Sequence, residues 1–278
     1  GGEHSVKVAL LACLACVLVA ITEPPPPSGS PPKLKPDVPK LEERADQRAV
    51  IFMSVLLSLV SGAVNALAII ELGGTVAHHT GNASHVGRLL GSDSMRFAAL
   101  MLAYLLGAAV PGFTRADGEA LYARRYSPSL LGGALMVLGA SLVYQGSALI
   151  ALSLLSASQG MQNTISRRCG SMPLCTTHMT GYLTDVGSDL GAWLSARGKE
   201  PTPLRTKLFF ASILAFVAGG YAAKRSLDAL GVMPTLDACA LVMAAAALGL
   251  IPLPKSASGD GVSFWGRKFP FAMGSRSA

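Results

Sequence analysis

Six apolar stretches follow one another between residues 49 and 253. A helix needs about 20 residues to cross roughly 30 Å of hydrocarbon, so stretches of this length favour membrane-spanning helices. Only 14% of the 278 residues are charged, against roughly 25% in a soluble domain, and 51% are hydrophobic. The sequence therefore predicts an all-α, polytopic integral membrane protein. Spanning helices are expected at residues 49–70, 95–113, 129–145, 147–166, 205–223 and 236–253.

The net charge of +7 does not indicate a nucleic-acid-binding surface, because the basic residues are scattered between the apolar stretches. They gather instead on one side of the predicted helices. By the positive-inside bias, that side and both ends of the six-helix unit face the cytoplasm or its organellar equivalent, and the plasma membrane and an organelle membrane both remain open. The richer side carries Arg115, Arg124, Arg125, Arg167, Arg168, Arg197, Lys199, Arg205 and Lys207, and the opposite side carries Arg88, Arg96, Lys224 and Arg225.

The segments outside the transmembrane domain (residues 49–253) differ in character. Residues 1–23 contain a short apolar run, which predicts a targeting signal or, alternatively, a signal anchor. Residues 24–48 are rich in proline and predict a flexible tether. Residues 254–278 combine basic and aromatic side chains in a C-terminal tail, which is expected either at the lipid headgroups or disordered.

One stretch of the chain occurs twice. Residues 77–87, AHHTGNASHVG, match residues 177–187, THMTGYLTDVG, and upstream GAVN at 62–65 matches GMQN at 160–163. If each copy has three spanning helices, an odd number, the second copy enters the membrane in the opposite orientation. This predicts two inverted three-helix repeats whose HxTG elements are re-entrant segments or half-helices that meet near the midplane. The repeats cover about residues 49–145 and 147–253.

Polar residues at equivalent places in the two copies are the candidate solute-binding residues. Two asparagines lie near the ends of apolar helices, just before a glycine-containing segment that interrupts the helix. Two threonines are expected to cap helix N-termini, whose unpaired N–H groups and partial positive charge suit an anion. Two histidines would exchange protons near neutral pH. The full candidate set is Asn65, His78, Thr80, Gly81, Asn82, Asn163, His178, Thr180 and Gly181.

A purely structural interpretation of these residues is also open. The threonines then satisfy the backbone of re-entrant turns in lipid, and the histidines bond to backbone carbonyls. A stripe of Ser54, Ser58 and Ser61 then holds helices together. Gly107 and Gly219, at corresponding positions of two other helices, are expected to permit close helix packing.

The two motifs together resemble a known family. ELGGTVAHHTGN at 71–82 and GMQNTISRRCG followed by TTHMTG at 160–181 are similar to the paired elements of the YoaK family of bacterial transmembrane proteins. The resemblance covers about residues 49–253, and it implies a multi-helix membrane fold with no established reaction or substrate. The chain departs from the pattern in having His79 where the family often has Met, and Tyr182 where the second copy would repeat Asn82.

The sequence carries no phosphate loop, nucleophile elbow or zinc-protease signature, so we expect no enzyme, catalytic residue, cofactor or metal site. The expected partners are the lipid bilayer and a small solute, and not nucleic acid. The functional hypothesis is a small-solute transporter or channel that is anion-selective and proton-linked. Two alternatives are a non-transporting membrane scaffold or assembly subunit, and a membrane metalloprotein.

Overall fold

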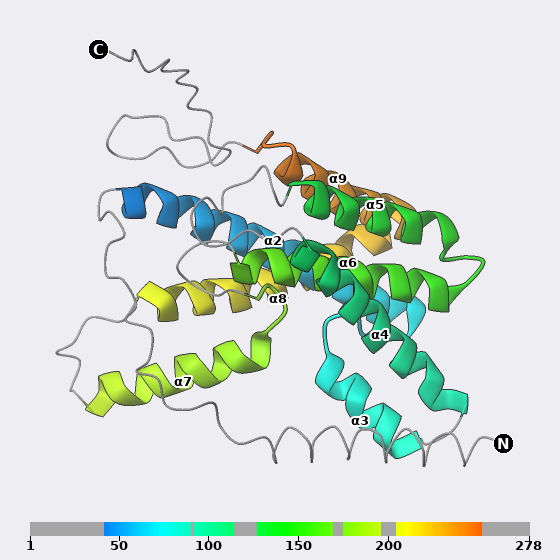
Figure 1. The fold of residues 1–278 in the computed structure, drawn as a ribbon, viewed down its shortest axis with the longest axis horizontal. Helices are drawn as coiled ribbons and strands as arrows, with labels where there is room; N and C mark the ends of the chain where they lie inside the picture. Colours follow the sequence, from blue (N-terminus) through cyan, green and yellow to red (C-terminus); the bar gives the residue numbers. More distant parts are fainter. Residues whose placement is uncertain (1–41, 90–91, 114–126, 169–174, 196–203, 252–278) are drawn as a thin grey trace, which may run out of the picture.

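The computed structural model of the chain describes residues 42–89, 92–113, 127–168, 175–195 and 204–251 (Figure 1). The predicted targeting segment and C-terminal tail lie outside these residues, as does most of the predicted tether. The described part is helical apart from short connections, which confirms the all-α prediction there. The helices are α2 (Glu42–Leu72), α3 (His79–Leu89), α4 (Ser92–Phe113), α5 (Ser127–Val143), α6 (Ala148–Arg168), α7 (Met179–Ser195), α8 (Leu204–Leu230) and α9 (Val232–Ala247).

Three of the described helices are long and apolar enough to cross a membrane, at Phe52–Leu72 in α2, Ser94–Pro111 in α4 and Arg205–Leu230 in α8. Two shorter apolar helices, α5 and α9, accompany them. Large apolar side chains stand exposed on α4 and α8, and a soluble protein rarely leaves such a surface uncovered. These lengths and faces are typical of a membrane protein. The exposed side chains include Leu102, Leu105 and Leu106 of α4 and Phe210, Leu214 and Val217 of α8.

The core lies between α2, α5, α6 and α9. Apolar side chains from these four helices fill it, among them the fully buried Leu67, Leu152, Leu236 and Met243. Buried serine, glutamine and asparagine side chains of α2 and α6 accompany them. The polar faces of the two helices thus point inward, which is the arrangement that an apolar exterior requires.

A glycine and an arginine end α2. Gly73 has a φ of 61°, in the left-handed region that glycine adopts without a steric penalty. Arg96 of α4 donates to the carbonyl oxygens of Leu72 and Gly73 at 2.6 and 2.9 Å, where the helix carries its partial negative charge. The connection that follows, loop 1 (residues 73–78), leads into α3. The equivalent connection between α6 and α7, loop 2, is described at residues 175–178.

Helices α2 and α8 cross at a pair of glycines. A Cβ atom added to Gly62 would lie 1.9 Å from the carbonyl oxygen of Phe216, and one added to Gly219 would lie 1.9 Å from that of Leu59. Any side chain at either position would therefore push the two helices apart.

Helices α4 and α6 cross in the same manner. A Cβ on Gly107 would lie 2.1 Å from the carbonyl oxygen of Ala157, and one on Gly160 would lie 2.2 Å from that of Tyr104. The prediction that Gly107 and Gly219 permit close packing is confirmed. Since α6 repeats α2 and α8 repeats α4, the two crossings are equivalent contacts of a duplicated unit.

The long helices alternate in direction. Between α4 and α6, Ser156 donates to the carbonyl of Leu100 at 2.8 Å, and Thr164 donates to that of Ala108 at 3.1 Å. Both helices advance by eight residues between these contacts, so they run parallel. Figure 1 shows α2 and α8 also parallel, and α5 and α9 running in opposite directions. Along the chain α2, α4, α5, α6, α8 and α9 therefore alternate, and α3 and α7 are the two short helices between them.

Candidate functional site

Two asparagines hold loop 1. Asn65, near the end of α2, accepts the backbone N–H groups of Val76 and Ala77 through its side-chain oxygen, both at 3.1 Å. Asn82 of α3 is buried, and its Nδ2 donates to the carbonyl of Thr75 at 3.1 Å. The Thr75 hydroxyl donates to Asn82 Oδ1 at 3.2 Å. Both predicted site residues thus fix the path of the loop.

Loop 2 is held by an equivalent pair of side chains. Asn163 of α6 accepts from the Thr176 hydroxyl at 2.9 Å and from the Thr177 N–H at 3.3 Å. The Tyr182 hydroxyl of α7 accepts from the Cys175 N–H and donates to the Cys175 carbonyl, both at 2.6 Å. Every one of these bonds ends on loop 2.

Tyr182 performs the task of Asn82 despite the change of residue. Each side chain reaches back seven residues to a loop carbonyl, Asn82 to Thr75 and Tyr182 to Cys175. The longer tyrosine replaces the amide donor by a phenolic one, and it also binds the N–H of the same residue. The departure from the motif therefore preserves the two-fold correspondence of the loops.

The helices after the two loops begin before the threonines of the HxTG motifs. α3 starts at His79 and α7 at Met179, so Thr80 and Thr180 lie inside the first turn, where both are exposed. The expectation that they are N-caps is wrong. The physical reason is a first-turn backbone hydrogen bond in α3 that already ends on the carbonyl of His78.

The glycine of each HxTG motif makes room for the histidine. A Cβ on Gly81 would lie 2.8 Å from Nδ1 of His78, and one on Gly181 would lie 2.2 Å from Nε2 of His178. Both histidines are exposed beside the helix start. Within the described ranges, no group of three His, Cys, Asp or Glu side chains is placed to hold a metal ion.

The start of α3 and the support of loop 2 meet at Tyr104 of α4. The ring of His79, the first residue of α3, lies 4.2 Å from the Tyr104 ring, centroid to centroid. The Tyr104 hydroxyl accepts from Asn163 Nδ2 at 2.7 Å, and the same Nδ2 donates to the Thr177 hydroxyl at 2.5 Å, two residues before α7. We name these four residues the junction. His79 begins α3 and Thr177 precedes α7 by two residues, so both helix N-termini lie at the junction, and Figure 1 shows α3 and α7 running in different directions.

Burial disfavours charged forms of His79 and of the neighbouring Cys175 thiol, and the positive charge of Arg167 acts on that thiol. Burial lowers the pKa of His79, against a smaller opposing effect of the Val76 backbone, so its ring is neutral near pH 7. Burial raises the pKa of the Cys175 thiol, while the positive charge of Arg167 acts in the opposite direction. Arg167 therefore places a positive charge near loop 2. None of the four junction residues is an aspartate or a glutamate. Helix N-termini add partial positive charge.

A row of buried polar side chains on α2 and α6 lies beside the junction. Gln162 of α6 donates to the carbonyl of Leu57 at 2.8 Å and to the Ser61 hydroxyl at 2.7 Å, which ties α6 to α2. Several side-chain atoms of this row have no hydrogen-bond partner in the described part of the chain. Those atoms are Ser58 Oγ, both carboxamide atoms of Gln159, Gln162 Oε1 and Ser166 Oγ.

Sequence reasoning missed three kinds of site residue. Gln159 and Gln162 stand in an apolar helix, and such an uncharged polar residue in a predicted span is itself a signal. Arg167 was assigned only to the charge pattern. Tyr104 belongs to no repeated motif, because the equivalent position in α8 is Phe216. Only the crossing of α4 and α6 brings Tyr104 to Asn163.

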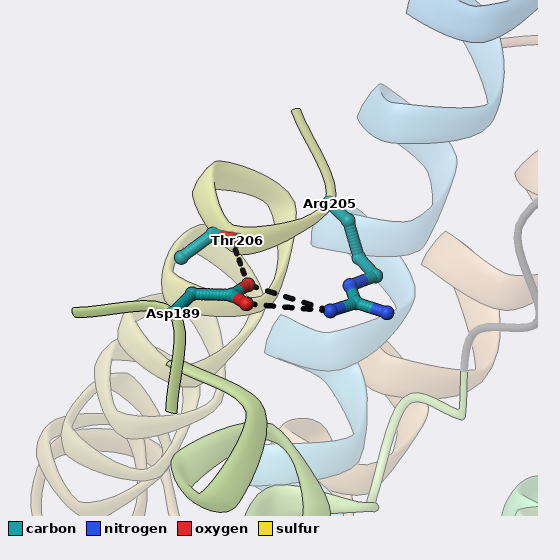
Figure 2. A network of polar contacts seen from close by, with 3 residues as sticks. All are labelled: Asp189, Arg205 and Thr206. Atoms are coloured by element: carbon teal, nitrogen blue, oxygen red, sulfur yellow. Dashed lines mark hydrogen bonds and ion pairs between the residues drawn. The ribbon is translucent and has the colours of Figure 1, made fainter. Parts of the chain in front are cut away.

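An ion pair orients α7 against α8. Figure 2 shows Asp189 of α7 facing Arg205 and Thr206 of α8, with the Asp189 carboxylate accepting from both. The guanidinium lies 3.4 Å from the carboxylate, and Arg205 is 54% exposed while Asp189 is only 18% exposed. The contact joins the C-terminal half of α7 to the start of α8.

The fold and the paired loops define a duplicated helical bundle with the helix lengths of a membrane protein. The chain belongs to the family described as Protein of unknown function (DUF1275), whose profile matches residues 53–249. This match covers nearly the same residues as the resemblance found in the sequence, and the YoaK name itself stays a prediction. No curated protein and no solved structure matches the chain.

Proposed function

We propose that this chain is a six-span membrane protein of two inverted repeats, and that it carries a small anion across the membrane by way of the junction. The alternating helices support the layout, because α2, α4 and α5 make an odd number of crossings before α6 begins. The HxTG helices α3 and α7 are then half-helices that start inside the protein. Their N-termini approach the junction from opposite sides.

The charge distribution supports the same layout. Arg167 and Arg205 lie at the ends of α6 and α8 that flank α7, while Arg96 lies in the first turns of α4, beside α3. Alternating spans place α7 on the basic side of the membrane and α3 on the other. By the positive-inside bias, α7 lies on the cytoplasmic or equivalent side.

The observation that carries the anion proposal is the meeting of two helix starts at one pair of side chains, Tyr104 and Asn163. Half-helices that point their N-termini at a shared central site are typical of transporters that bind anionic groups there. The Asn163 amide, the Tyr104 hydroxyl and the Thr177 hydroxyl supply hydrogen-bonding groups without negative charge. A scaffold would need no such polar meeting point within its bundle.

Proton coupling is proposed through His79 rather than through His78 or His178. His79 is the imidazole that lies against the Tyr104 ring, and its Nε2 is buried without a partner in the described residues. An anion beside it would favour the protonated ring, so anion and proton would bind together. An inward proton gradient is expected to accelerate uptake, and His79→Met should remove that acceleration.

The test is anion uptake into liposomes that contain the purified protein. Chloride, phosphate, succinate and malate are offered at pH 7.5, and protein-free liposomes give the background. We expect uptake of at least one anion above this background, and a reduction of at least tenfold in Asn163→Asp. The aspartate has the shape of asparagine and the neighbouring hydroxyls can reverse their bonds, so the variant adds a negative charge to an intact junction.

Thr164→Val is the matched control. This neighbouring side chain donates to the Ala108 carbonyl of α4 and is not one of the four junction residues. It should retain uptake. If folded wild-type protein takes up none of the four anions, the transport proposal is wrong and the scaffold alternative is favoured.

A further inference from the structure

Gln159 is a long polar side chain in a place that offers it nothing to bond. It is completely buried within α6, and neither its Nε2 nor its Oε1 has a hydrogen-bond partner in the described part of the chain. Buried carboxamides are almost always paired, because leaving both the donor and the acceptor unpaired destabilises a fold. Leucine or methionine would fill the same space without that loss.

The repeat explains where the side chain points. The correspondence that pairs Asn65 with Asn163 also pairs Ser61 with Gln159. Ser61 of α2 donates across to the Thr176 hydroxyl of loop 2 at 3.1 Å. Thr176 of loop 2 corresponds to Val76 of loop 1, so from the repeat we infer that Gln159 faces loop 1 at Val76. Valine has no hydrogen-bonding side chain, which agrees with the unpaired carboxamide of Gln159.

The unused carboxamide lies next to the proposed anion site. Gln159 and Asn163 are one helical turn apart on the same face of α6, about 6 Å along the helix axis. Asn163 belongs to the junction, where the anionic group would bind. A second polar group of a small solute would therefore come within reach of Gln159.

We propose that Gln159 is the specificity-determining residue of the anion site and that the solute is a small organic carboxylate with a hydroxyl group. The inference rests on the proposed transport function. The carboxamide can donate to and accept from one hydroxyl, whereas an inorganic anion or an unsubstituted carboxylate leaves it unpaired. A site that bonds a substrate hydroxyl strongly rejects the analogue without one.

Malate and succinate test the proposal, because they differ by a single hydroxyl and are both dianions at pH 7.5. Wild-type protein in liposomes should take up malate at least tenfold faster than succinate at equal low concentration. Gln159→Met keeps the volume of the side chain and removes its hydrogen bonds. It should bring the ratio of the two rates to about one, mainly by slowing malate.

Two further variants make the result interpretable. Gln145→Met applies the same substitution to an exposed glutamine between α5 and α6, and it should leave the ratio unchanged. Gln159→Glu keeps the size and one acceptor, and its negative charge should slow both anions. Size-exclusion profiles and thermal melts of all variants show whether each has folded, so a loss of uptake is not mistaken for misfolding.

The outcomes separate this inference from the function on which it rests. Equal rates for malate and succinate in the wild type, or an unchanged preference in Gln159→Met, would overturn the role of Gln159 and leave anion transport standing. Uptake of chloride or phosphate without uptake of malate would overturn the hydroxycarboxylate class. No uptake of any anion by folded wild type would overturn both proposals.

Discussion

Replacing Gly107 by alanine tests the packing on which the junction depends. The added Cβ would lie 2.1 Å from the Ala157 carbonyl oxygen, a backbone atom that cannot rotate away. To reach even 3.0 Å, α4 and α6 would have to separate by about 0.9 Å. The hydrogen bonds from Ser156 and Thr164 to α4, now 2.8 and 3.1 Å long, would then stretch beyond useful length.

The expected loss of stability in Gly107→Ala is the sum of three contributions. Overpacking costs about 1–3 kcal/mol, and two weakened hydrogen bonds cost about 1 kcal/mol each. Alanine returns up to about 1 kcal/mol through its greater helix propensity. The net loss of stability is therefore about 2–4 kcal/mol, which corresponds to a Tm lower by roughly 5–15 °C for a chain of this size.

Thermal melts in mild detergent measure the effect, with Gly87→Ala as the matched control. A Cβ at Gly87 in α3 would meet nothing within 4 Å, so this variant should melt at or slightly above the wild-type temperature. Gly219→Ala should also lower the Tm, because it blocks the equivalent crossing of α2 and α8. A Gly107→Ala protein as stable as Gly87→Ala would refute the close crossing.

Three further predictions concern the loops and their supports. Because burial lowers the pKa of His79, acidification from pH 7.5 to 5.5 protonates the unfolded chain first and lowers the Tm, and His79→Met should lessen this fall. Asn163→Leu removes four hydrogen bonds and should lower the free energy of unfolding, measured by chemical denaturation, by about 2–4 kcal/mol. Asn65→Leu removes two and should lower it by about half as much. Equal losses would contradict the difference between the loops. Asp189→Asn weakens an exposed ion pair with Arg205 worth under about 1 kcal/mol, so it should speed hydrogen exchange in α7 and leave α3 and the Tm unchanged.

The helical architecture could be predicted from the sequence because it depends on local pattern and on duplication. Apolar stretches located the long helices, and Gly107 and Gly219 were expected at close helix contacts, although the helices that they meet were not predicted. The bounds differed where polar residues continue a helix beyond its apolar part, as in α8, which was expected to end at residue 223 and reaches Leu230. α6 is helical as predicted, but its inward serines and glutamines keep it out of the set that is apolar enough to span by composition.

The site was predictable only where the repeat marked it. Asn65 and Asn163 stand beside the loops as expected, since equivalent motifs bend the chain in equivalent ways. Tyr104 could not be predicted, because helix packing decides which residue of α6 it meets. Its repeat-equivalent residue in α8 is Phe216, so the repeat does not mark it. The threonines of HxTG were expected at the helix starts and lie within them instead, since backbone bonding begins the turn earlier.

The proposed function requires the two repeats to enter the membrane in opposite orientations. Single cysteines at Gly87 in α3 and Gly187 in α7 test it, because both positions are open and correspond in the repeat. Each is introduced after the five native cysteines are replaced by serine, and a membrane-impermeant maleimide is applied to vesicles of known sidedness. Inverted repeats require the two positions to be labelled from opposite sides of the membrane. Labelling of both from the same side would contradict the inverted arrangement.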